Sequence, residues 1–227
     1  MKAWGKIRCK HLFSSESASE AVTPVVGSIL MLLILVVLAG AVANSIFNSV
    51  GEDANFQPLI AKITIKSCDG GLRYAPKSEN ATFENNSIVL AHEGGSPLPL
   101  DATCIKILGD GNTYQGDVGG GGITIKGKTE VFYQNLSPTG KNPTYYVVNN
   151  KATLEDGSWD VGEKLVLCGQ DSAEGIVKSS VKVSVDGDSD TSDNYGFKAG
   201  SEITLKVIDI KNSNVIAEQR AIIKHAE

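Results

Sequence analysis

The stretch from Val22 to Val50, VTPVVGSILMLLILVVLAGAVANSIFNSV, decides the architecture of this 227-residue chain. It contains no Asp, Glu, Lys, Arg or His, and from Val25 to Ala43 only Ser28 interrupts the apolar run. A helix needs about 20 apolar residues to cross the hydrocarbon core of a bilayer, so this stretch is long enough to span a membrane. A helix without a polar face must be surrounded by lipid or by other apolar helices.

The charges on either side of this stretch predict its orientation. The whole chain has 21 Lys and Arg against 26 Asp and Glu, a net charge of −5. The first 21 residues hold four basic and two acidic groups, which leaves 17 basic and 24 acidic residues beyond them. Basic residues ahead of a first apolar helix stay in the cytoplasm, so the C-terminal part is expected outside. Its acidic balance argues against nucleic acid as a partner.

Three interpretations of residues 1–50 compete. The first is a secretory signal, because Ala41-Val42-Ala43 fits the small-x-small cleavage rule and would free a chain that begins at Asn44. The second is an uncleaved anchor that holds a surface domain. The third is a short charged leader that is removed while the apolar helix is kept.

The residues around Pro24 favour the third interpretation. Thr23 followed by Pro24 predicts a helix start, since the hydroxyl can cap and proline suits the first helical position. The helix is then expected to run to about Val50 and to end at Gly51. Small residues such as Gly27 and Gly40 allow helices to approach closely, although they are also common in any spanning helix.

Two segments resemble archaeal type IV pilins. Residues 21–31, AVTPVVGSILM, are similar to the family pattern A-V-S-P-V-I-G-x-I-L-M, with Thr23 for the usual Ser and Val26 for the usual Ile. Residues 88–98, IVLAHEGGSPL, resemble a second patch of the same family, a strand followed by an H-x-G-G turn. Bacterial pilins keep a Glu where Val26 stands, and Glu20 replaces the usual basic residue just ahead of the cleavage point.

The resemblance implies a division of the chain into four parts. These are a cytoplasmic leader (1–21), a transmembrane and filament-core helix (22–51), a linker (52–58) and an extracellular β-domain (59–227). A prepilin peptidase would cut between Ala21 and Val22. The helix residues that the resemblance assigns to helix start and assembly are Thr23, Pro24, Gly27, Leu33, Val37 and Gly40.

The function that the resemblance implies is structural. The subunit would wait in the cytoplasmic membrane with its C-terminus outside, and would polymerise with its own copies into a cell-surface filament. An assembly ATPase and a membrane platform are the implied partners, and surfaces or other cells are the implied targets of adhesion. We expect no enzymatic activity and no cofactor. The alternative is a monomeric, membrane-anchored extracellular β-sandwich domain that binds a ligand.

Short alternating segments fill the chain after Ile60. Separated by Gly, Asn and Asp, they are typical of a β-sandwich or barrel. The expected fold is therefore α+β, a long N-terminal hydrophobic helix followed by an all-β, immunoglobulin-like sandwich. The expected strands are residues 61–66, 87–92, 103–108, 122–126, 130–134, 145–148, 164–168, 177–185, 203–210 and 215–223.

Several residues of the outer part are candidate sites. Asn80, Asn85 and Asn135 begin N-x-S/T sequons, which an outward-facing domain would expose to glycosylation. Cys68, Cys104 and Cys168 can form at most one internal disulfide, with the pairing open. The acidic loop at 186–193 resembles the start of a calcium loop but lacks the needed Gly and the closing Glu, so a solvated hairpin tip is the stronger interpretation. Its weak candidate ligands are Asp186, Asp188, Asp190 and Asp193.

Overall fold

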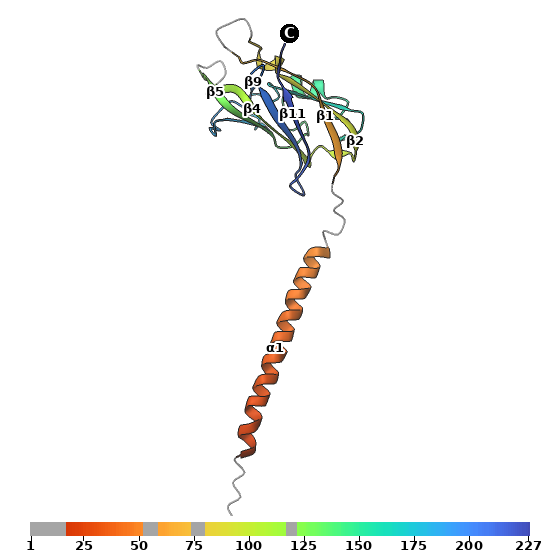
Figure 1. The fold of residues 1–227 in the computed structure, drawn as a ribbon, viewed down its shortest axis with the longest axis vertical. Helices are drawn as coiled ribbons and strands as arrows, with labels where there is room; N and C mark the ends of the chain where they lie inside the picture. The colour runs from red at the N-terminus through yellow and green to blue at the C-terminus, as the bar shows by residue number, and fades with distance from the viewer. Residues whose placement is uncertain (1–16, 52–58, 74–79, 117–121) are drawn as a thin grey trace, which may run out of the picture. The chain divides into compact units, whose positions relative to one another are not determined.

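A computed structural model describes residues 17–51, 59–73, 80–116 and 122–227. The chain divides into two compact units, Met1–Gln57 and Pro58–Glu227. The first unit contains one helix and the second a domain built almost entirely of strands (Figure 1). The expected α+β class is thus confirmed. The expected linker, 52–58, lies outside the described residues, as does most of the expected leader.

Helix α1 spans Ser17–Gly51 and ends at the residue expected for its stop. Its start differs from the expectation, because the helix begins at Ser17 and continues through Thr23 and Pro24. Residues 17–21 contain no Gly or Pro and two Ala, so the uncleaved chain can extend the helix upstream. Pro24 then lies inside the helix, where it lacks one backbone N–H donor.

Two sheets make up most of the β-domain. The first has the order β12-β1-β2-β7, and the second the order β11-β10-β4-β5-β8 with β9 paired to β4. The first sheet consists of β12 (Lys224–His225), β1 (Ala61–Gly70), β2 (Ser87–Gly95) and β7 (Lys164–Cys168). The second consists of β11 (Asn214–Ile222), β10 (Glu202–Asp209), β4 (Thr103–Gln115), β5 (Ile123–Tyr133), β8 (Val181–Val185) and β9 (Gly196–Phe197). The short strands β3 (Leu98–Pro99) and β6 (Ser158–Trp159) pair with each other.

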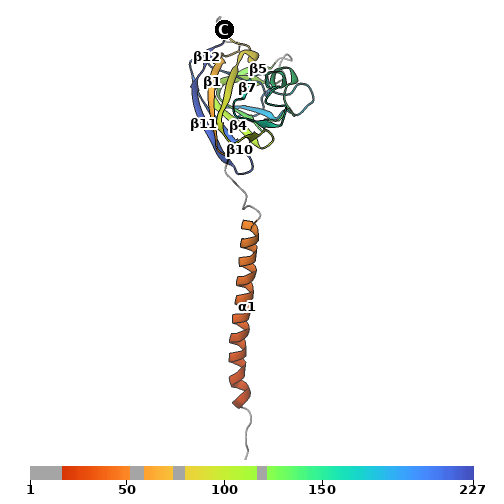
Figure 2. The ribbon, with the colours of Figure 1, turned by 90° about the vertical axis from the view of Figure 1, so that its right-hand side faces the viewer.

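The strand order matches the inner part of an immunoglobulin sandwich. The sequence β1-β2-β7 corresponds to strands A-B-E, and β11-β10-β4-β5 corresponds to G-F-C-C′, with every pair antiparallel. Strand β8 departs from that pattern, because it joins the edge of the second sheet after β7 in the chain. The sheets also approach at one side, where β1 and β11 run side by side (Figures 1 and 2).

Alternating side chains from both sheets form one apolar core. In β10, every second residue from Ile203 onward is buried, which fits a strand with one face on the core and one in solvent. The core joins Ile63 and Leu90 of the first sheet to Ile105 and Leu205 of the second. Trp159 of β6 is fully buried in the same cluster.

The expected strand at 145–148 is wrong, because Pro143–Val147 form a short π-helical turn, η2. The side chain of Asn142 accepts hydrogen bonds from the backbone N–H groups of Thr144 (2.8 Å) and Tyr145 (3.4 Å). Pro143 fits the first turn of a helix. Local capping therefore overrides the β-propensity of the Tyr-Tyr-Val-Val run.

Two other expected strands change their bounds. Residues 177–180 do not belong to β8, which begins at Val181, because Ser179 and Ser180 use their hydroxyls on nearby backbone groups. The two segments 122–126 and 130–134 form one long strand, β5, since Gly127, Lys128 and Thr129 keep their pairing with β4.

Asn86 connects parts of the domain that are far apart in sequence. It is 2% exposed, and its Oδ1 accepts hydrogen bonds from the N–H groups of Phe197 (2.8 Å) and Gly71 (3.4 Å). Its Nδ2 donates to the carbonyls of Thr82 (2.9 Å) and Gly71 (3.1 Å). This single side chain thus joins the end of β1, the short 3-10 turn η1 (Phe83–Asn85) and β9 of the other sheet.

A second buried polar group lies between the tyrosines of the core. Asp171 is fully buried, and its Oδ2 accepts hydrogen bonds from the Tyr133 hydroxyl (2.8 Å) and the Cys168 N–H (2.7 Å). The Tyr133 hydroxyl also contacts that of Tyr195 at 2.8 Å. Burial raises the pKa of Asp171 from 3.8 to about 7, although these hydrogen bonds and the charge of Lys141 oppose the shift. Asp171 is therefore largely protonated in mildly acidic solution.

We expect Asn86→Ala to destabilise the β-domain by about 2–4 kcal/mol, because buried N–H and C=O groups of the backbone would lose their hydrogen-bond partner. Urea unfolding of the full chain in detergent, followed by near-ultraviolet circular dichroism, measures the loss. The neighbouring Asn85 is exposed, so Asn85→Ala should change stability by less than about 0.5 kcal/mol. Equal effects of the two substitutions would contradict the bridging role of Asn86.

The raised pKa of Asp171 predicts a stability that falls with pH. The unfolded carboxyl titrates near 3.8, so its contribution is complete below that pH and is lost as pH rises through about 7. The loss between pH 4 and pH 7.5 should be on the order of 2–4 kcal/mol. Burial lowers the pKa of Lys141 to about 8, so its own contribution changes only above that pH.

Asp171→Asn should remove this slope, whereas Asp156→Asn, at an exposed position, should keep it. Urea midpoints of the full chain at a series of pH values test the expectation. A slope that survives in Asp171→Asn would assign the pH dependence to other groups.

Candidate functional site

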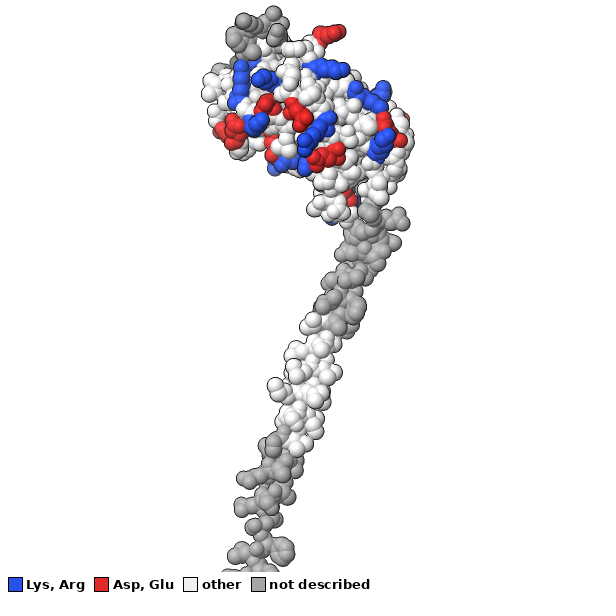
Figure 3. Space-filling view, in the orientation of Figure 1, with Lys and Arg blue, Asp and Glu red and all other residues white. Residues whose placement is uncertain are grey.

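The apolar surface of α1 is the most prominent candidate site. The segment Val25–Val42 has a mean hydropathy of 2.9, and none of its 18 residues is buried. Leu33 and Val37 are each 61% exposed. Figure 3 shows no charged side chain on the described part of this helix, whereas charges of both signs mix on the visible face of the β-domain. The segment is thus long and apolar enough to cross a membrane.

The polar and small residues of the helix leave this surface uninterrupted. The Ser28 hydroxyl donates to the carbonyl of Val25 at 2.9 Å, so its hydrogen-bond donor is paired within the helix. A Cβ placed on Gly27 or on Gly40 would meet no other atom within 4 Å. At both glycines the helix surface carries no side chain, so the backbone of a neighbouring helix could approach closely there.

The predicted cleavage point lies within α1. Ala21, Val22, Thr23 and Pro24 are all helical in the uncleaved chain, and their side chains lie outside the description. A continuous helix through the cleavage point means that the peptidase must open this turn or act on a helical substrate. Cleavage between Ala21 and Val22 stays a prediction.

The three predicted glycosylation sites differ in exposure. Asn80 and Asn85 are exposed, and Asn85 closes the turn η1. Asn135 is only half-exposed, and its Oδ1 accepts hydrogen bonds from the Ser137 hydroxyl (2.9 Å) and from Lys141 Nζ (3.3 Å). Asn80 and Asn85 are thus more accessible to a modifying enzyme than Asn135.

The three cysteines that could supply at most one disulfide are not joined in the structure. Cys68, Cys104 and Cys168 are all buried and free. Burial raises the pKa of the Cys68 and Cys168 thiols to about 12, so both stay protonated and unreactive at neutral pH. The three side chains act as small apolar residues in the core.

The acidic loop at 186–193, the weak calcium candidate, does not bring its carboxylates together. Among the described residues, no group of three or more His, Cys, Asp or Glu side chains is arranged to hold a metal. Asp186 accepts from the Lys128 N–H at 2.9 Å, Asp188 from Gln115 Nε2 and the Asp190 N–H, and Asp193 pairs with Lys182. The carboxylates are therefore engaged separately and do not converge.

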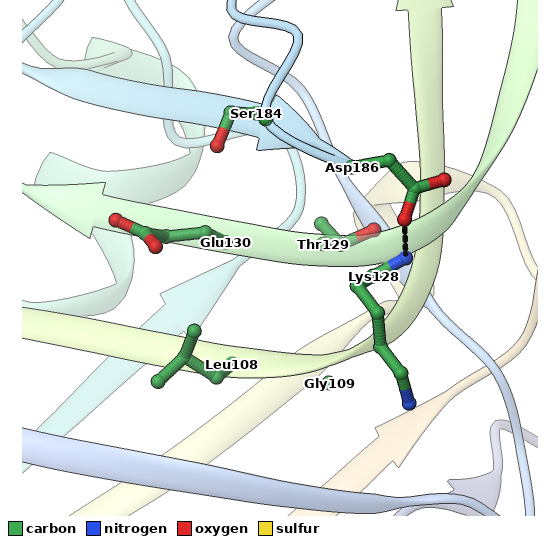
Figure 4. Close-up of a pocket in the computed structure, with 8 residues that line it drawn as sticks. Leu108, Gly109, Lys128, Thr129, Glu130, Ser184 and Asp186 are labelled. Atoms are coloured by element: carbon green, nitrogen blue, oxygen red, sulfur yellow. Dashed lines mark hydrogen bonds between the residues drawn. The ribbon is translucent and has the colours of Figure 1, made fainter.

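Asp186 instead borders a hollow over strands β4, β5 and β8 (Figure 4). Leu108 and Thr129 line it together with two charged residues, Lys128 and Glu130. These charges are already paired, because Lys128 contacts Asp110 at 2.6 Å and Glu130 contacts Lys106 at 2.7 Å. Two of the three charged groups that line the hollow are thus held in ion pairs, and the third, Asp186, accepts the Lys128 N–H.

The second patch of the sequence that resembles pilins has a structural role. His92 is buried within β2, and its Nε2 contacts the Ser96 carbonyl at 3.0 Å. Its ring packs edge-on against Trp159, with centroids 5.8 Å apart. Glu93 pairs with Lys62 and Lys66 of β1. These contacts close the β2–β3 turn over the core.

Comparison with known proteins bears on the helix. The family model described as "Archaeal Type IV pilin, N-terminal" matches residues 20–58. No curated protein matches the chain. The matched residues include the predicted cleavage point and the whole apolar segment Val25–Val42. Residues 20–58, which hold the apolar part of α1, are thus similar to the N-terminal segment of archaeal type IV pilins.

Proposed function

We propose that this protein polymerises through α1 into an archaeal type IV pilus-like filament and presents its β-domain to surfaces or other cells. The observation that carries the proposal is that no residue of the uncharged segment Val25–Val42 is buried, in a chain whose residues 20–58 match the N-terminal model of archaeal type IV pilins. Burying apolar area yields about 25 cal/mol per Å². A surface this large must therefore lie in lipid or against other helices.

The helix suits both of these environments in turn. Before assembly, lipid surrounds it and the basic leader keeps the N-terminus in the cytoplasm. After assembly, copies of the same helix replace the lipid, and the flat positions at Gly27 and Gly40 allow close packing. Removal of the leader favours the transfer of α1 from lipid into the filament core, because the charged residues of the leader would lose their hydration there at a high free-energy cost.

The β-domain is suited to form the outer layer. Its core is complete by itself, and its surface carries both signs of charge in neighbouring pairs, as Lys106–Glu130 and Lys206–Glu218 illustrate. Glycans on the exposed Asn80 and Asn85 would shield that surface. A prepilin peptidase, an assembly ATPase and a membrane platform are the proposed partners, and the role is structural rather than catalytic.

Leu33→Lys should abolish filaments, because an ammonium in the middle of an apolar helix bundle costs about 2.5–3.5 kcal/mol per subunit or more. Electron microscopy of material sheared from cells, after replacement of the chromosomal copy, measures the loss. Immunoblots of the membrane fraction must still detect the subunit, so that failed insertion is not mistaken for failed assembly. As a matched control, Ile123→Lys on the exposed face of β5 should leave filaments intact.

Normal filaments in Leu33→Lys would contradict packing of α1 in the filament core. The absence of any filament in the unaltered strain would instead support a monomeric, membrane-anchored binding domain.

The mature chain should begin at Val22. Intact-mass analysis of protein purified from the native membrane or surface measures the start, and deletion of the prepilin peptidase should restore the mass of the full leader. A start at Met1 would support an uncleaved anchor, and a start at Asn44 would support free secretion.

A further inference from the structure

Lys141 is an unusual residue of the β-domain because its side chain is buried without a carboxylate in contact. It is 5% exposed, and lysine is almost never so buried unless it is paired. Its Nζ donates to the carbonyl of Ser137 (2.7 Å), to Ser180 Oγ (3.1 Å) and to Asn135 Oδ1 (3.3 Å). All three acceptors are neutral, and none of the ion pairs among the described residues includes Lys141. A charged ammonium here is costly.

Burial raises the neutral fraction of the Lys141 amine, whereas its three donated hydrogen bonds use all the N–H groups of the ammonium. Burial lowers the pKa of Lys141 to about 8, although the charge of nearby Asp171 opposes the shift. The ring of Tyr146 lies 4.9 Å from Nζ and favours the charged form. The ammonium therefore predominates at neutral pH, and the unprotonated minority, which grows as the pH rises towards 8, has a lone pair for attack on an electrophile.

The carboxamide of Asn135 is the electrophile within reach. Its Oδ1 accepts from the Ser137 hydroxyl at 2.9 Å and from Lys141 Nζ, and both donors polarise the C=O bond. Attack on the carbon that bears this oxygen requires the amine to leave the hydrogen bond and to turn its lone pair towards the face of the carboxamide. The Ser137 hydroxyl is placed to stabilise negative charge that develops on Oδ1 during an attack.

Rigid neighbours hold both groups in place. The Gln134 N–H donates to the Ser180 carbonyl (2.9 Å), and the N–H of the fully buried Leu136 donates to the Leu100 carbonyl (2.7 Å). The Tyr146 hydroxyl donates to the Leu136 carbonyl at 2.7 Å. Tyr146 thus contacts both ends of the 135–141 loop, and such preorganisation raises the effective concentration of an amine near an amide.

We propose that Lys141 and Asn135 join through an intramolecular isopeptide bond, formed with loss of ammonia. The lone pair of the neutral Nζ attacks Cγ of Asn135, and the C=O electrons move to Oδ1, where Ser137 holds them. The intermediate collapses by breaking the Cγ–Nδ2 bond. Nδ2 leaves as ammonia after taking one proton from the attacking nitrogen. The products are one secondary amide and one ammonia, and no oxidant or other co-reactant is needed.

The bond resolves the energetic problem of the buried lysine. A neutral amide replaces the ammonium, so the desolvation cost of the charge disappears. The linkage closes the loop of residues 135–141 into a covalent ring between the end of β5 and η2. It also excludes a glycan on Asn135, because the same Nδ2 would be the point of attachment. The inference rests on the β-domain alone and does not depend on filament assembly.

Mass spectrometry of the full chain, produced in a host without N-glycosylation and purified in detergent, tests the proposal. The intact mass should be about 17 Da below the value for the unmodified sequence, the mass of the ammonia released. Trypsin should fail to cleave after Lys141. Chymotryptic cleavage after Leu136 should leave the two halves of the loop joined, because the isopeptide bond spans the cut.

Variants separate this bond from other losses of ammonia. Lys141→Arg and Asn135→Ala should each restore the unmodified mass, whereas Lys66→Arg, at an exposed ion pair, should retain the loss. Ser137→Ala should slow formation of the bond on the order of tenfold or more, because it removes the donor to Oδ1. Ser137→Thr should restore the rate, since it returns the hydroxyl.

An unmodified intact mass of the wild-type chain would overturn the proposal and leave Lys141 as a hydrogen-bonding brace of the loop. A loss of about 17 Da that maps to another Asn, or that persists in Lys141→Arg, would overturn it equally.

Discussion

The structure depends on one constraint, which is that the side chains of α1 from Val25 to Val42 are all apolar or small, apart from Ser28, and none of them is buried. Exposing such a helix to water is unfavourable, so the protein must place it in lipid or against other apolar helices. The β-domain imposes no comparable demand, because its two sheets bury a common core that includes Ile63, Ile105 and Leu205. The chain therefore combines one unit that needs apolar surroundings with one that is complete by itself.

This separation would let one chain serve in the two settings of the proposed function. When identical helices replace lipid around α1, its side chains keep apolar neighbours. The free energy of transfer of the helix from membrane to filament therefore need not be large. Helices in lipid gain little from the hydrophobic effect between them, and association then depends on packing. The flat positions at Gly27 and Gly40 matter for that reason more than any single large side chain.

The sequence predicted the elements whose signals are long and regular. The charge-free stretch identified α1, and the alternation in Ile203–Ile210 and Thr103–Leu108 identified β10 and β4. It failed where one polar side chain reorganises the backbone. Asn142 caps a helical turn and so overrides the strand propensity of Tyr145–Val148. The start of α1 at Ser17 was also missed, because the cap predicted at Thr23 describes a cleaved chain, whereas the uncleaved chain has helix-forming residues upstream.

The candidate sites follow the same rule. The exposure of Leu33 and Val37 follows from local sequence, since no residue in the helix could cover them. The disulfide and the calcium loop depend on which side chains converge in space, and residue counts cannot supply that. In the sequence, Asp186 and Asp193 stand in one acidic loop. In the fold they make separate contacts, Asp186 with the Lys128 backbone N–H and Asp193 with the Lys182 side chain.

The fold also buries ionisable side chains at positions that the sequence did not suggest. Asp171 and Lys141 look like ordinary surface charges in the sequence, yet the fold buries Asp171 against Tyr133 and Lys141 against the neighbouring Tyr146. A domain that buries ionisable groups must neutralise them, by a shift of the pKa, by a hydrogen-bonded partner or by covalent chemistry. Asp171 uses the first two of these routes. Lys141, whose acceptors are all neutral and one of which is a carboxamide, has the third open to it as well.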